Sequence, residues 1–555
     1  MSTRKKSSPV RVIPLGGVGE IGLNCTVIET EEDMLVIDAG LMFPEEDMPG
    51  VDIVIPDFSY IIENREKVRG LFLTHGHEDH IGAIPYLLRF MPEVPVYGGP
   101  LTLAFVSARM KEQGLAISSA SVAVKAGDII SAGSMKVEFI TVCHSIADSF
   151  AMAVSTRAGV VLHTGDFKID QTPIDGKRMD LTRFAELGRA GVALMLSDST
   201  NSINPGYTGS ESVVGEGLLE AFRAAKGRVL VATFASHVAR IQQVLQAAAV
   251  TGRKVAIAGR SLIVNSKIAT ELGYIKAYPG VVIELSQVDD LPDDEVVIIA
   301  TGTQGEPTSA LTRMAMSEFK RTSIKKGDTV ILAASIIPGN EKSVFRTINH
   351  LYKLGADVIG RKDAKIHVSG HASQEELKLV LGLVQPRNFI PVHGEYTHLH
   401  NHAKLAARMG VSEQNILIAG SGDVVELKAG RARINGHVQA SRVMVDGYGV
   451  GDVGKYVLRD RMILSNDGIL VAVVVIDKDT GAYIKGPEIV SRGFVYEKES
   501  EALFDEVGKV CRKALSKNTS MGGAAVAETL KDVIASFLSQ KTGRKPLIIP
   551  HVLEL

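Results

Sequence analysis

The stretch LFLTHGHEDHIGAIPYLL, Leu71–Leu88, decides the fold, because an apolar strand, LFLT, runs directly into the polar sequence HGHEDH. Imidazole nitrogens and carboxylate oxygens are good zinc ligands. Positions 75, 77 and 79 alternate, so an extended turn can direct them toward one pocket, while His80 begins the following helix. Four ligands from one loop are too many for a single metal that also needs ligands from elsewhere, so the stretch favours two metals. The alternative is a solvated polar turn that is rich in histidine.

Other polar residues end apolar strands in the same way. His144 ends FITVCH, Asp166 ends VLHTGD and His393 lies in IPVHGE. Asp38 in VIDAG and Asp198 in LSDST also lie at strand ends, where an uncompensated carboxylate would be costly. One shared site explains these positions better than separate structural roles do. Five further histidines are predicted to lie outside the site, the last three of them on a solvated helix: His163, His350, His398, His400 and His402.

Composition sets the broad class of protein. A chain of 555 residues, 45% hydrophobic and 22% charged, is long enough for roughly two to four globular domains. The net charge of −2 means that any nucleic-acid binding must use a local basic groove. The three cysteines form no CxxC motif, which fits a reducing compartment and argues against a thiolate metal site. With no apolar run of membrane-spanning length, the sequence predicts a cytoplasmic protein that has no membrane partner.

The pattern of strands and helices changes along the chain. From Arg11 to about Asn201, short β-rich runs predict a β-sandwich core with a site along one edge, and HIGAIPYLLRFM (80–91) is expected to form a helix. From about Tyr207, apolar strands alternate with helix-length segments, which indicates a parallel α/β domain. KIHVSGHAS (365–373) is expected to return to a strand whose end bears histidines, and the last hundred or so residues predict a small α+β domain.

A glycine motif near the N-terminus looks like a dinucleotide fingerprint. Gly17, Gly19 and Gly22 match GxGxxG, but the fingerprint requires a following helix, and here the sequence continues into strands. A glycine-rich turn between two strands is the better interpretation.

Taken together, these motifs resemble a known family. HGHEDH with Asp38, His144 and Asp166 resembles the metallo-β-lactamase fold, and Asp198, His371 and His393 look like the additional motifs of its β-CASP nucleases. The stretches SDSTNSINPGYTGSE, TFASHVAR, TGTQGEP and PGNE are similar to the bacterial ribonuclease J family over almost the whole chain. The resemblance implies an α/β fold, a metallo-β-lactamase αββα sandwich with an inserted α/β β-CASP domain and a small α+β C-terminal domain. It suggests these divisions: 1–10, flexible basic tail; 11–207 with 372–445, metallo-β-lactamase domain; 208–371, β-CASP domain; 446–458, linker; 459–555, C-terminal domain for oligomerisation.

The resemblance also implies a role for each site residue. Asp166 would bridge two zinc ions, and a hydroxide held between the metals would attack the phosphodiester. Asp38 and Asp198 would fix the orientation of imidazoles, and His371 would be the general acid. Mn²⁺ or Mg²⁺ would be alternatives to zinc in the cell. The implied ligands are His75, His77 and His144 for one zinc, and Asp79, His80 and His393 for the other.

Two segments are expected to hold substrate phosphate. FASH (234–237) and HVSGH (367–371) are both predicted to follow a strand and to open a helix, where hydroxyls, imidazoles and backbone amides can face an anion. Helix capping by serine is the alternative. The residues implied are Ser236, His237, His367, Val368, Ser369, Gly370 and His371.

The function implied is a zinc-dependent ribonuclease with 5′→3′ exonuclease activity, preferring 5′-monophosphorylated single-stranded RNA, and endonuclease activity. Its roles would be rRNA and mRNA maturation and decay, with RNA-degradation factors as partners and a homodimer or tetramer formed through the C-terminal domain. Two alternatives stay open: a small-molecule hydrolase of the same superfamily and a catalytically silent RNA-binding subunit. Arg240, Arg260 and Lys267 are candidates for contacts with the RNA backbone, although surface arginines and lysines are usually only solvated. Glu46, Asp52 and Asp446 are candidates for holding a structural cation.

Overall fold

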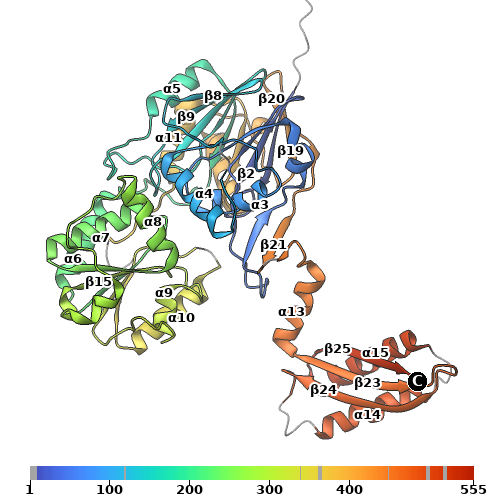
Figure 1. The fold of residues 1–555 in the computed structure, drawn as a ribbon. Helices are drawn as coiled ribbons and strands as arrows, with labels where there is room; N and C mark the ends of the chain where they lie inside the picture. The colour runs from blue at the N-terminus through green and yellow to red at the C-terminus, as the bar shows by residue number, and fades with distance from the viewer. Residues whose placement is uncertain are drawn as a thin grey trace, which may run out of the picture. The chain divides into compact units, whose positions relative to one another are not determined.

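A computed structural model shows the fold of the chain (Figure 1). It describes residues 9–117, 120–337, 339–360, 365–447, 449–495, 501–516 and 522–555, so most of the predicted N-terminal tail lies outside the described residues. The chain forms two compact units, one from residues 1–43 with 54–443 and one from residues 44–53 with 444–555. None of the helices in the described part of the chain has the length and apolar character that crossing a membrane requires.

Two β-sheets form the centre of the first unit. The eight-stranded sheet has the order β20-β19-β1-β2-β3-β5-β6-β7, and the six-stranded sheet has the order β18-β12-β11-β10-β9-β8. The first comprises β1 (Val10–Gly16), β2 (Cys25–Glu29), β3 (Met34–Ile37), β5 (Val68–Phe72), β6 (Val96–Gly98), β7 (Val122–Ala123), β19 (Asp423–Lys428) and β20 (Arg431–His437). The second comprises β8 (Ile129–Ala132), β9 (Met135–Thr141), β10 (Phe150–Thr156), β11 (Gly159–His163), β12 (Val192–Asp198) and β18 (Phe389–Val392).

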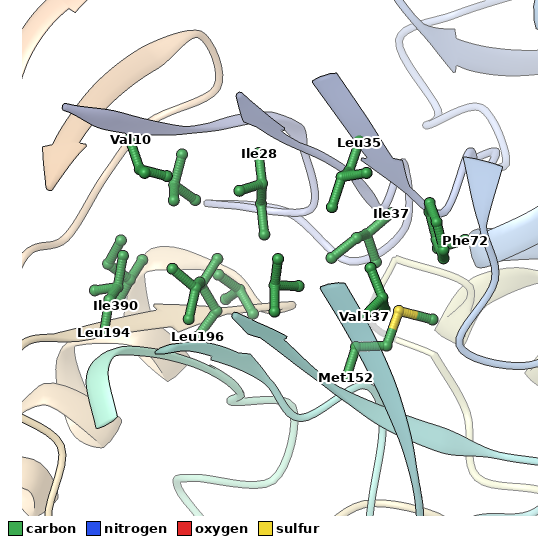
Figure 2. Packing of buried hydrophobic residues seen from close by; sticks show 14 of the residues in the cluster. Val10, Ile28, Leu35, Ile37, Phe72, Val137, Met152, Leu194, Leu196 and Ile390 are labelled. Atoms are coloured by element: carbon green, nitrogen blue, oxygen red, sulfur yellow. The ribbon is translucent and has the colours of Figure 1, made fainter. Parts of the chain in front are cut away.

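The two sheets face each other across an apolar core. Figure 2 shows Ile28, Leu35 and Ile37 of one sheet opposite Leu196 and Met152 of the other, all of them buried. On the outer face of the six-stranded sheet, a second core forms with α5 (Leu181–Ala190), α11 (Gln374–Val384) and α12 (Tyr396–Arg408). On the eight-stranded sheet, α4 (Pro100–Glu112) packs against β6. This is the predicted αββα layering.

An α/β insert lies between β12 and α11 in the chain. Its sheet is parallel throughout, with the order β14-β15-β13-β16-β17, as the alternation of apolar strands and helices predicted. The strands are β13 (Val229–Ala232), β14 (Lys254–Ala258), β15 (Val296–Ala300), β16 (Thr329–Leu332) and β17 (Asp357–Ile359). The helices are α6 (Ser212–Ala224), α7 (Val238–Thr251), α8 (Arg260–Glu271), α9 (Ala310–Ala315) and α10 (Glu341–Lys353).

The second unit is a small α+β domain. Its three-stranded sheet has the order β24-β23-β25, and α14 and α15 pack against one face of it. The elements are α13 (Lys455–Asp467), β23 (Ile469–Ile476), β24 (Tyr483–Arg492), α14 (Glu501–Leu515), α15 (Gly523–Thr542) and β25 (Leu547–Glu554), and α13 begins within the predicted linker. Asp446, one of the suggested cation ligands, pairs instead with Arg461 at 2.5 Å.

Two local predictions are wrong. The helix expected over 80–91 is two short helices, α2 (Glu78–Ile81) and α3 (Ile84–Leu88), because the amide of Ala83 donates to Ala39 O at 2.9 Å and not to its own helix. The strand expected at the start of 365–373 is absent from the described structure of that segment. Its backbone bonds to side chains, among them Arg240 Nη1 at 2.7 Å from Ile366 O.

The glycine-rich segment forms the predicted turn. Gly17, Gly19 and Gly22 have positive φ angles of 77°, 77° and 101°, and they connect the antiparallel strands β1 and β2. The carbonyl of Gly17 accepts a hydrogen bond from the amide of His393 at 2.6 Å. The turn therefore supports the candidate site and belongs to no dinucleotide fold.

Candidate metal centre

The strands deliver the predicted residues to one edge of the sandwich. β11, β12 and β18 are neighbouring parallel strands, and Asp166, Asp198 and His393 follow or end them. β3 and β5 are also parallel neighbours, and they are followed by Asp38 and His75. Because parallel neighbours end at the same edge of a sheet, residues far apart in sequence come together there.

Three histidines converge on one point. His75 Nε2 and His144 Nε2 lie 3.0 and 3.1 Å from His77 Nδ1. Two nitrogens bound to one tetrahedral zinc are about 3.3 Å apart, given a Zn–N distance of about 2.0 Å. The spacing of the three nitrogens therefore fits a single metal ion.

The protons on two of these rings can be assigned from their partners. His144 Nδ1 lies 2.7 Å from the carbonyl oxygen of Gly370, which only accepts, so Nδ1 carries the proton. The Thr74 hydroxyl donates to Asp38 at 2.7 Å and can therefore accept from His75 Nδ1 at 3.0 Å. Both rings are left with the lone pair of Nε2 directed at the point of convergence, as a metal requires.

A second cluster adjoins the first. Asp79, His80, Asp166 and His393 place one ligand atom each within 4.8 Å of the others. His80 Nε2 lies 3.2 Å from Asp166 Oδ2, and His393 Nε2 lies 3.2 Å from Asp79 Oδ2 without forming a hydrogen bond in the described structure. Asp166 Oδ2 is also 3.7 Å from His75 Nε2, so this carboxylate faces both clusters. The donor set fits two ions that share Asp166.

Burial and neighbouring charge divide the histidines into two groups. Burial is the largest influence on the pKa of His75, His77 and His144 and lowers all three, that of His77 to about 4, so these rings are neutral. Burial also lowers the pKa of His393, but Asp166 and Asp79 outweigh it and raise the pKa to about 10. The same carboxylates, with Asp38, raise the pKa of His80 against the effect of burial. The second cluster thus favours positive charge strongly.

Asp38 orients His80 through its carboxylate. Its Oδ2 lies 2.8 Å from His80 Nδ1, and its Oδ1 accepts from the amide of Thr74 at 2.8 Å. The residue has φ 60°, a left-handed conformation that is unfavourable for a side chain other than glycine, asparagine or aspartate. His393 has φ 54°. Aspartate and histidine adopt this conformation more readily than most side chains do, and hydrogen bonds of the surrounding structure hold both residues in it beside the site.

Asp198 orients His371 in the same manner. Its Oδ2 lies 2.8 Å from His371 Nδ1, while its Oδ1 accepts from the amide and hydroxyl of Thr200 at 2.9 and 2.8 Å. Burial lowers the pKa of His371, but the charge and hydrogen bond of Asp198 outweigh it, and the pKa lies above the ordinary value. His371 Nε2 remains available to a substrate.

The predicted phosphate-binding segments lie close together. Arg240, in the first turn of α7, donates from Nη1 to the carbonyl of Ile366, which holds FASH and HVSGH near each other. His237 is buried and its Nδ1 accepts from the Arg240 amide at 3.1 Å, so in the neutral ring Nε2 carries the proton. Nε2 forms no hydrogen bond in the described structure, and Glu211 Oε1 lies 3.9 Å from it. Ser369 Oγ accepts from Asn201 Nδ2 at 2.8 Å and keeps its own proton free to donate.

Several smaller predictions need correction. Arg240 is no surface contact for RNA: it is fully buried, and its guanidinium pairs with Glu211 at 2.6 Å. His398 and His402 are not solvated, since they are 7% and 0% exposed, although His400 on the same helix is exposed. The HVSGH segment opens no helix directly: α11 begins at Gln374, after a capping box made by Ser373.

Sequence reasoning missed the residues that hold the site residues in place. Thr74 contacts Asp38 and His75, and it directly precedes the histidine motif. Asn201 donates to Ser369 and to the carbonyl of His371 at 2.9 Å. Asn24 donates to the carbonyl of Asp79 at 3.1 Å. Thr74 and Asn201 lie within stretches quoted above, LFLTHGHEDH and SDSTNSINPGYTGSE, but their partners are distant in sequence and nothing local indicated them.

The fold and site define a metallo-hydrolase of the metallo-β-lactamase superfamily with a β-CASP insert. Residues 18–178 match the family model for the metallo-beta-lactamase superfamily, and residues 357–418 match the Zn-dependent metallo-hydrolase RNA specificity domain. Residues 226–351 match the ribonuclease J beta-CASP domain, and residues 456–555 match the ribonuclease J C-terminal domain. The predicted fold class is confirmed, while the predicted domain boundaries themselves stay predictions.

Full-length relatives identify the family. The chain is 43% identical to "Ribonuclease J2" of Bacillus subtilis (strain 168), with 100% of both chains covered. It is 44% identical to "Ribonuclease J 1" of Streptococcus pyogenes serotype M3, with 99% of this chain and 98% of the relative covered. The chain therefore belongs to the ribonuclease J family, and the predicted class of enzyme, a metal-dependent ribonuclease, is confirmed.

A solved structure supports the fold alone. A protein of unknown function from Enterococcus faecalis V583 superposes with a TM-score of 0.53 at 16% identity, covering 76% of this chain and 100% of that one.

Asp38→Asn tests how the imidazoles are oriented. The new amide directs hydrogens at His80 Nδ1–H and at the Thr74 hydroxyl, where a carboxylate now accepts. We expect zinc affinity, measured by competition with a chromogenic chelator, to fall roughly 10–100-fold. Asp180→Asn is the matched control, because Asp180 caps α5 and asparagine caps helices equally well. Equal affinity in both variants would contradict the role of Asp38.

Proposed function

We propose that the chain is a two-zinc ribonuclease that hydrolyses single-stranded RNA. The observation that carries the proposal is a pair of neighbouring ligand clusters, one of which contains Asp166, whose Oδ2 also lies 3.7 Å from His75 Nε2 of the other. The match of residues 357–418 to an RNA specificity domain adds the substrate class. His75, His77 and His144 would hold one ion, and Asp79, His80 and His393 the other. Zinc bound there would lower the pKa of water and neutralise charge on the scissile phosphate. Mn²⁺ and Mg²⁺ are alternatives in the cell.

The proposed role of His371 is to give a proton to the leaving 3′ oxygen. Three features support this role. The His371 ring adjoins the clusters, with 4.9 Å between its centroid and that of His144, and Asp198 accepts from its Nδ1. In the part of the chain that the structure describes, Nε2 of His371 makes no hydrogen bond. The charge and hydrogen bond of Asp198 raise the pKa of His371, which favours the protonated ring that a general acid needs.

His371→Ala should slow RNA cleavage by roughly 100-fold or more while zinc content stays unchanged, because general-acid catalysis contributes at least that factor. Zinc is measured by elemental analysis and cleavage under single-turnover conditions. His400→Ala, at an exposed position on α12, is the control and should behave as the native enzyme. Loss of zinc from the His371 variant would make the residue a ligand and would exclude the proposed role.

We further propose that FASH and HVSGH bind the 5′-monophosphate of RNA, which permits 5′→3′ exonuclease action beside endonuclease action. The buried Nε2–H of His237 and the free hydroxyl proton of Ser369 are donors that a phosphate oxygen would satisfy. Ser236, His367, Val368 and Gly370 would complete the pocket. Such an activity suits a cytoplasmic role in rRNA and mRNA maturation and decay, together with other RNA-degradation factors.

His237→Asn tests this pocket, because asparagine can still cap α7 but offers no Nε2–H. The substrates are matched single-stranded RNAs with 5′-monophosphate, 5′-triphosphate or 5′-hydroxyl ends. We expect the native enzyme to release mononucleotides fastest from the monophosphate, and the variant to lose roughly tenfold of that preference while internal cleavage continues. An unchanged end preference would remove the pocket's role, and native enzyme that binds zinc but cleaves no RNA would favour a small-molecule hydrolase or a silent RNA-binding subunit.

We propose that the C-terminal domain forms a homodimer or tetramer through its open sheet face. α14 and α15 cover one face of the sheet, and β23 alternates strictly between buried and half-buried residues. On the other face, Val471 pairs in register with Val490 and Ile549, which are 48% and 43% exposed. A second copy of this chain offers an equally apolar face, so two copies can cover each other.

Val490→Lys should weaken this association without unfolding the domain, because the position is half exposed while α14 and α15 pack on the opposite face. Analytical ultracentrifugation should show a dimer or tetramer for the native chain and a shift to monomer for the variant. Ser536→Lys, at an exposed position on α15 away from the open sheet face, controls for added charge. A native chain that is monomeric at micromolar concentration would contradict the proposal.

A further inference from the structure

One loop of the metal centre contacts the β-CASP insert away from the phosphate pocket. Asp148 follows His144 in the loop between β9 and β10, and it has a left-handed φ of 57°. Its Oδ2 accepts from the amide of Leu101 at 3.3 Å, so the carboxylate caps the N-terminus of α4, where Gly99 has no side chain to do so. A side chain at Gly99 would collide with Asp148, which shows how closely the loop and the helix approach.

The second partner of Asp148 comes from the insert. The hydroxyl of Tyr274, just beyond the end of α8, donates a short hydrogen bond to Asp148 Oδ2. Lys177 Nζ lies 3.5 Å from Asp148 Oδ1 and 6.0 Å from the centre of the Tyr274 ring. α8 and α4 pack against each other beside this contact.

The phenol of Tyr274 stays protonated and can therefore donate to Asp148. Burial and the hydrogen bond with Asp148 raise the pKa of Tyr274 well above its ordinary value, so the phenol keeps its proton. Hydrogen bonds to a charged acceptor are stronger than those between neutral groups, and a half-buried one is only partly screened by water. The contact with Lys177 contributes less, because that side chain is 58% exposed.

We propose that Tyr274 is a positioning residue for RNA cleavage, latching the β-CASP insert to the His144 loop through Asp148 and so holding the insert against the metal face. The inference rests on the proposed function, because it assumes that the substrate is an RNA that touches both domains. Asp148 keeps its bond to α4 when Tyr274 is altered, so loss of the latch leaves the ligands in place. The latch therefore acts on the binding of long substrates.

Tyr274→Phe removes the hydroxyl alone. We expect KM for a long single-stranded RNA to rise about tenfold, with kcat changed less than twofold. Zinc content and hydrolysis of bis(p-nitrophenyl) phosphate, a small diester that has no RNA chain to lie along the insert, should match the native enzyme. Asp148→Asn, which tolerates the left-handed backbone, should give the same rise in KM, and the double variant should be no worse than either single one.

Tyr278→Phe is the matched control, because among the described residues the Tyr278 hydroxyl makes one side-chain hydrogen bond, accepting from Gln242 Nε2 at 3.5 Å. An equal KM in the two phenylalanine variants would overturn the latch. An equal loss on RNA and on the small diester, or a loss of zinc, would also overturn it, because the contact would then serve the metal ligands.

Hydrogen exchange measures the latch without any reaction. In Tyr274→Phe, amides of residues 144–149 and 272–276 should exchange faster than in the native chain, and Tyr278→Phe should leave them unchanged. Unchanged exchange in Tyr274→Phe would exclude the latch. If the native enzyme hydrolyses the small diester but no RNA, the proposed function fails, and the exchange result still decides whether the contact joins the two domains.

Discussion

The carboxylate of Asp166 is the constraint on which the site depends. It is 3% exposed, and five imidazoles approach it, those of His393 and His80 at 2.9 and 3.2 Å and those of His75, His144 and His371 within 3.9 Å. A buried charge is tolerated only where opposite charge and hydrogen bonds surround it. The chain meets that condition by bringing residues from both sheets and the insert to the end of β11, and the arrangement that compensates Asp166 also presents the lone pairs that bind metal ions.

The direction of the strands brings these residues together. Parallel neighbours in each sheet end at one edge, so the side chains that follow β3, β5, β11, β12 and β18 need no long loops to meet. Two residues at this edge, Asp38 and His393, adopt a left-handed backbone conformation. Each is held by the structure around it: Asp38 by Thr74, and His393 by the carbonyl of Gly17. The left-handed backbone at these two positions directs a carboxylate and an imidazole into one small volume.

The layers of the sandwich, and the gathering of the strand-end histidines and aspartates at one edge, were predictable because both leave local signals: apolar runs of fixed period, and polar residues that end them. What escaped prediction depends on contacts across long sequence separations. In the sequence, Arg240 is an ordinary charged helix residue. In the structure, its guanidinium pairs with Glu211 and donates to the carbonyl of Ile366. His402 is polar in sequence, yet it is buried against Phe389 and Ser199. The segment 365–373 has the sequence pattern of a strand, but side chains from other segments form hydrogen bonds with its backbone carbonyls. Period and composition say nothing of such partners.

The insert is part of the metal centre and does more than cover it. The carbonyl of Gly370, at the end of the insert, fixes the tautomer of His144, a proposed ligand that belongs to the sandwich. Asp198, which ends β12, accepts from Nδ1 of His371 in the same HVSGH segment, so the segment orients His144 and has its own imidazole oriented by the sandwich. These two bonds, of 2.7 and 2.8 Å, join the HVSGH segment to the metal face at His144 and at Asp198. The contact of Tyr274 with Asp148 joins the insert to the same face at a separate point, so the segment at the site can keep its bonds when that contact is removed.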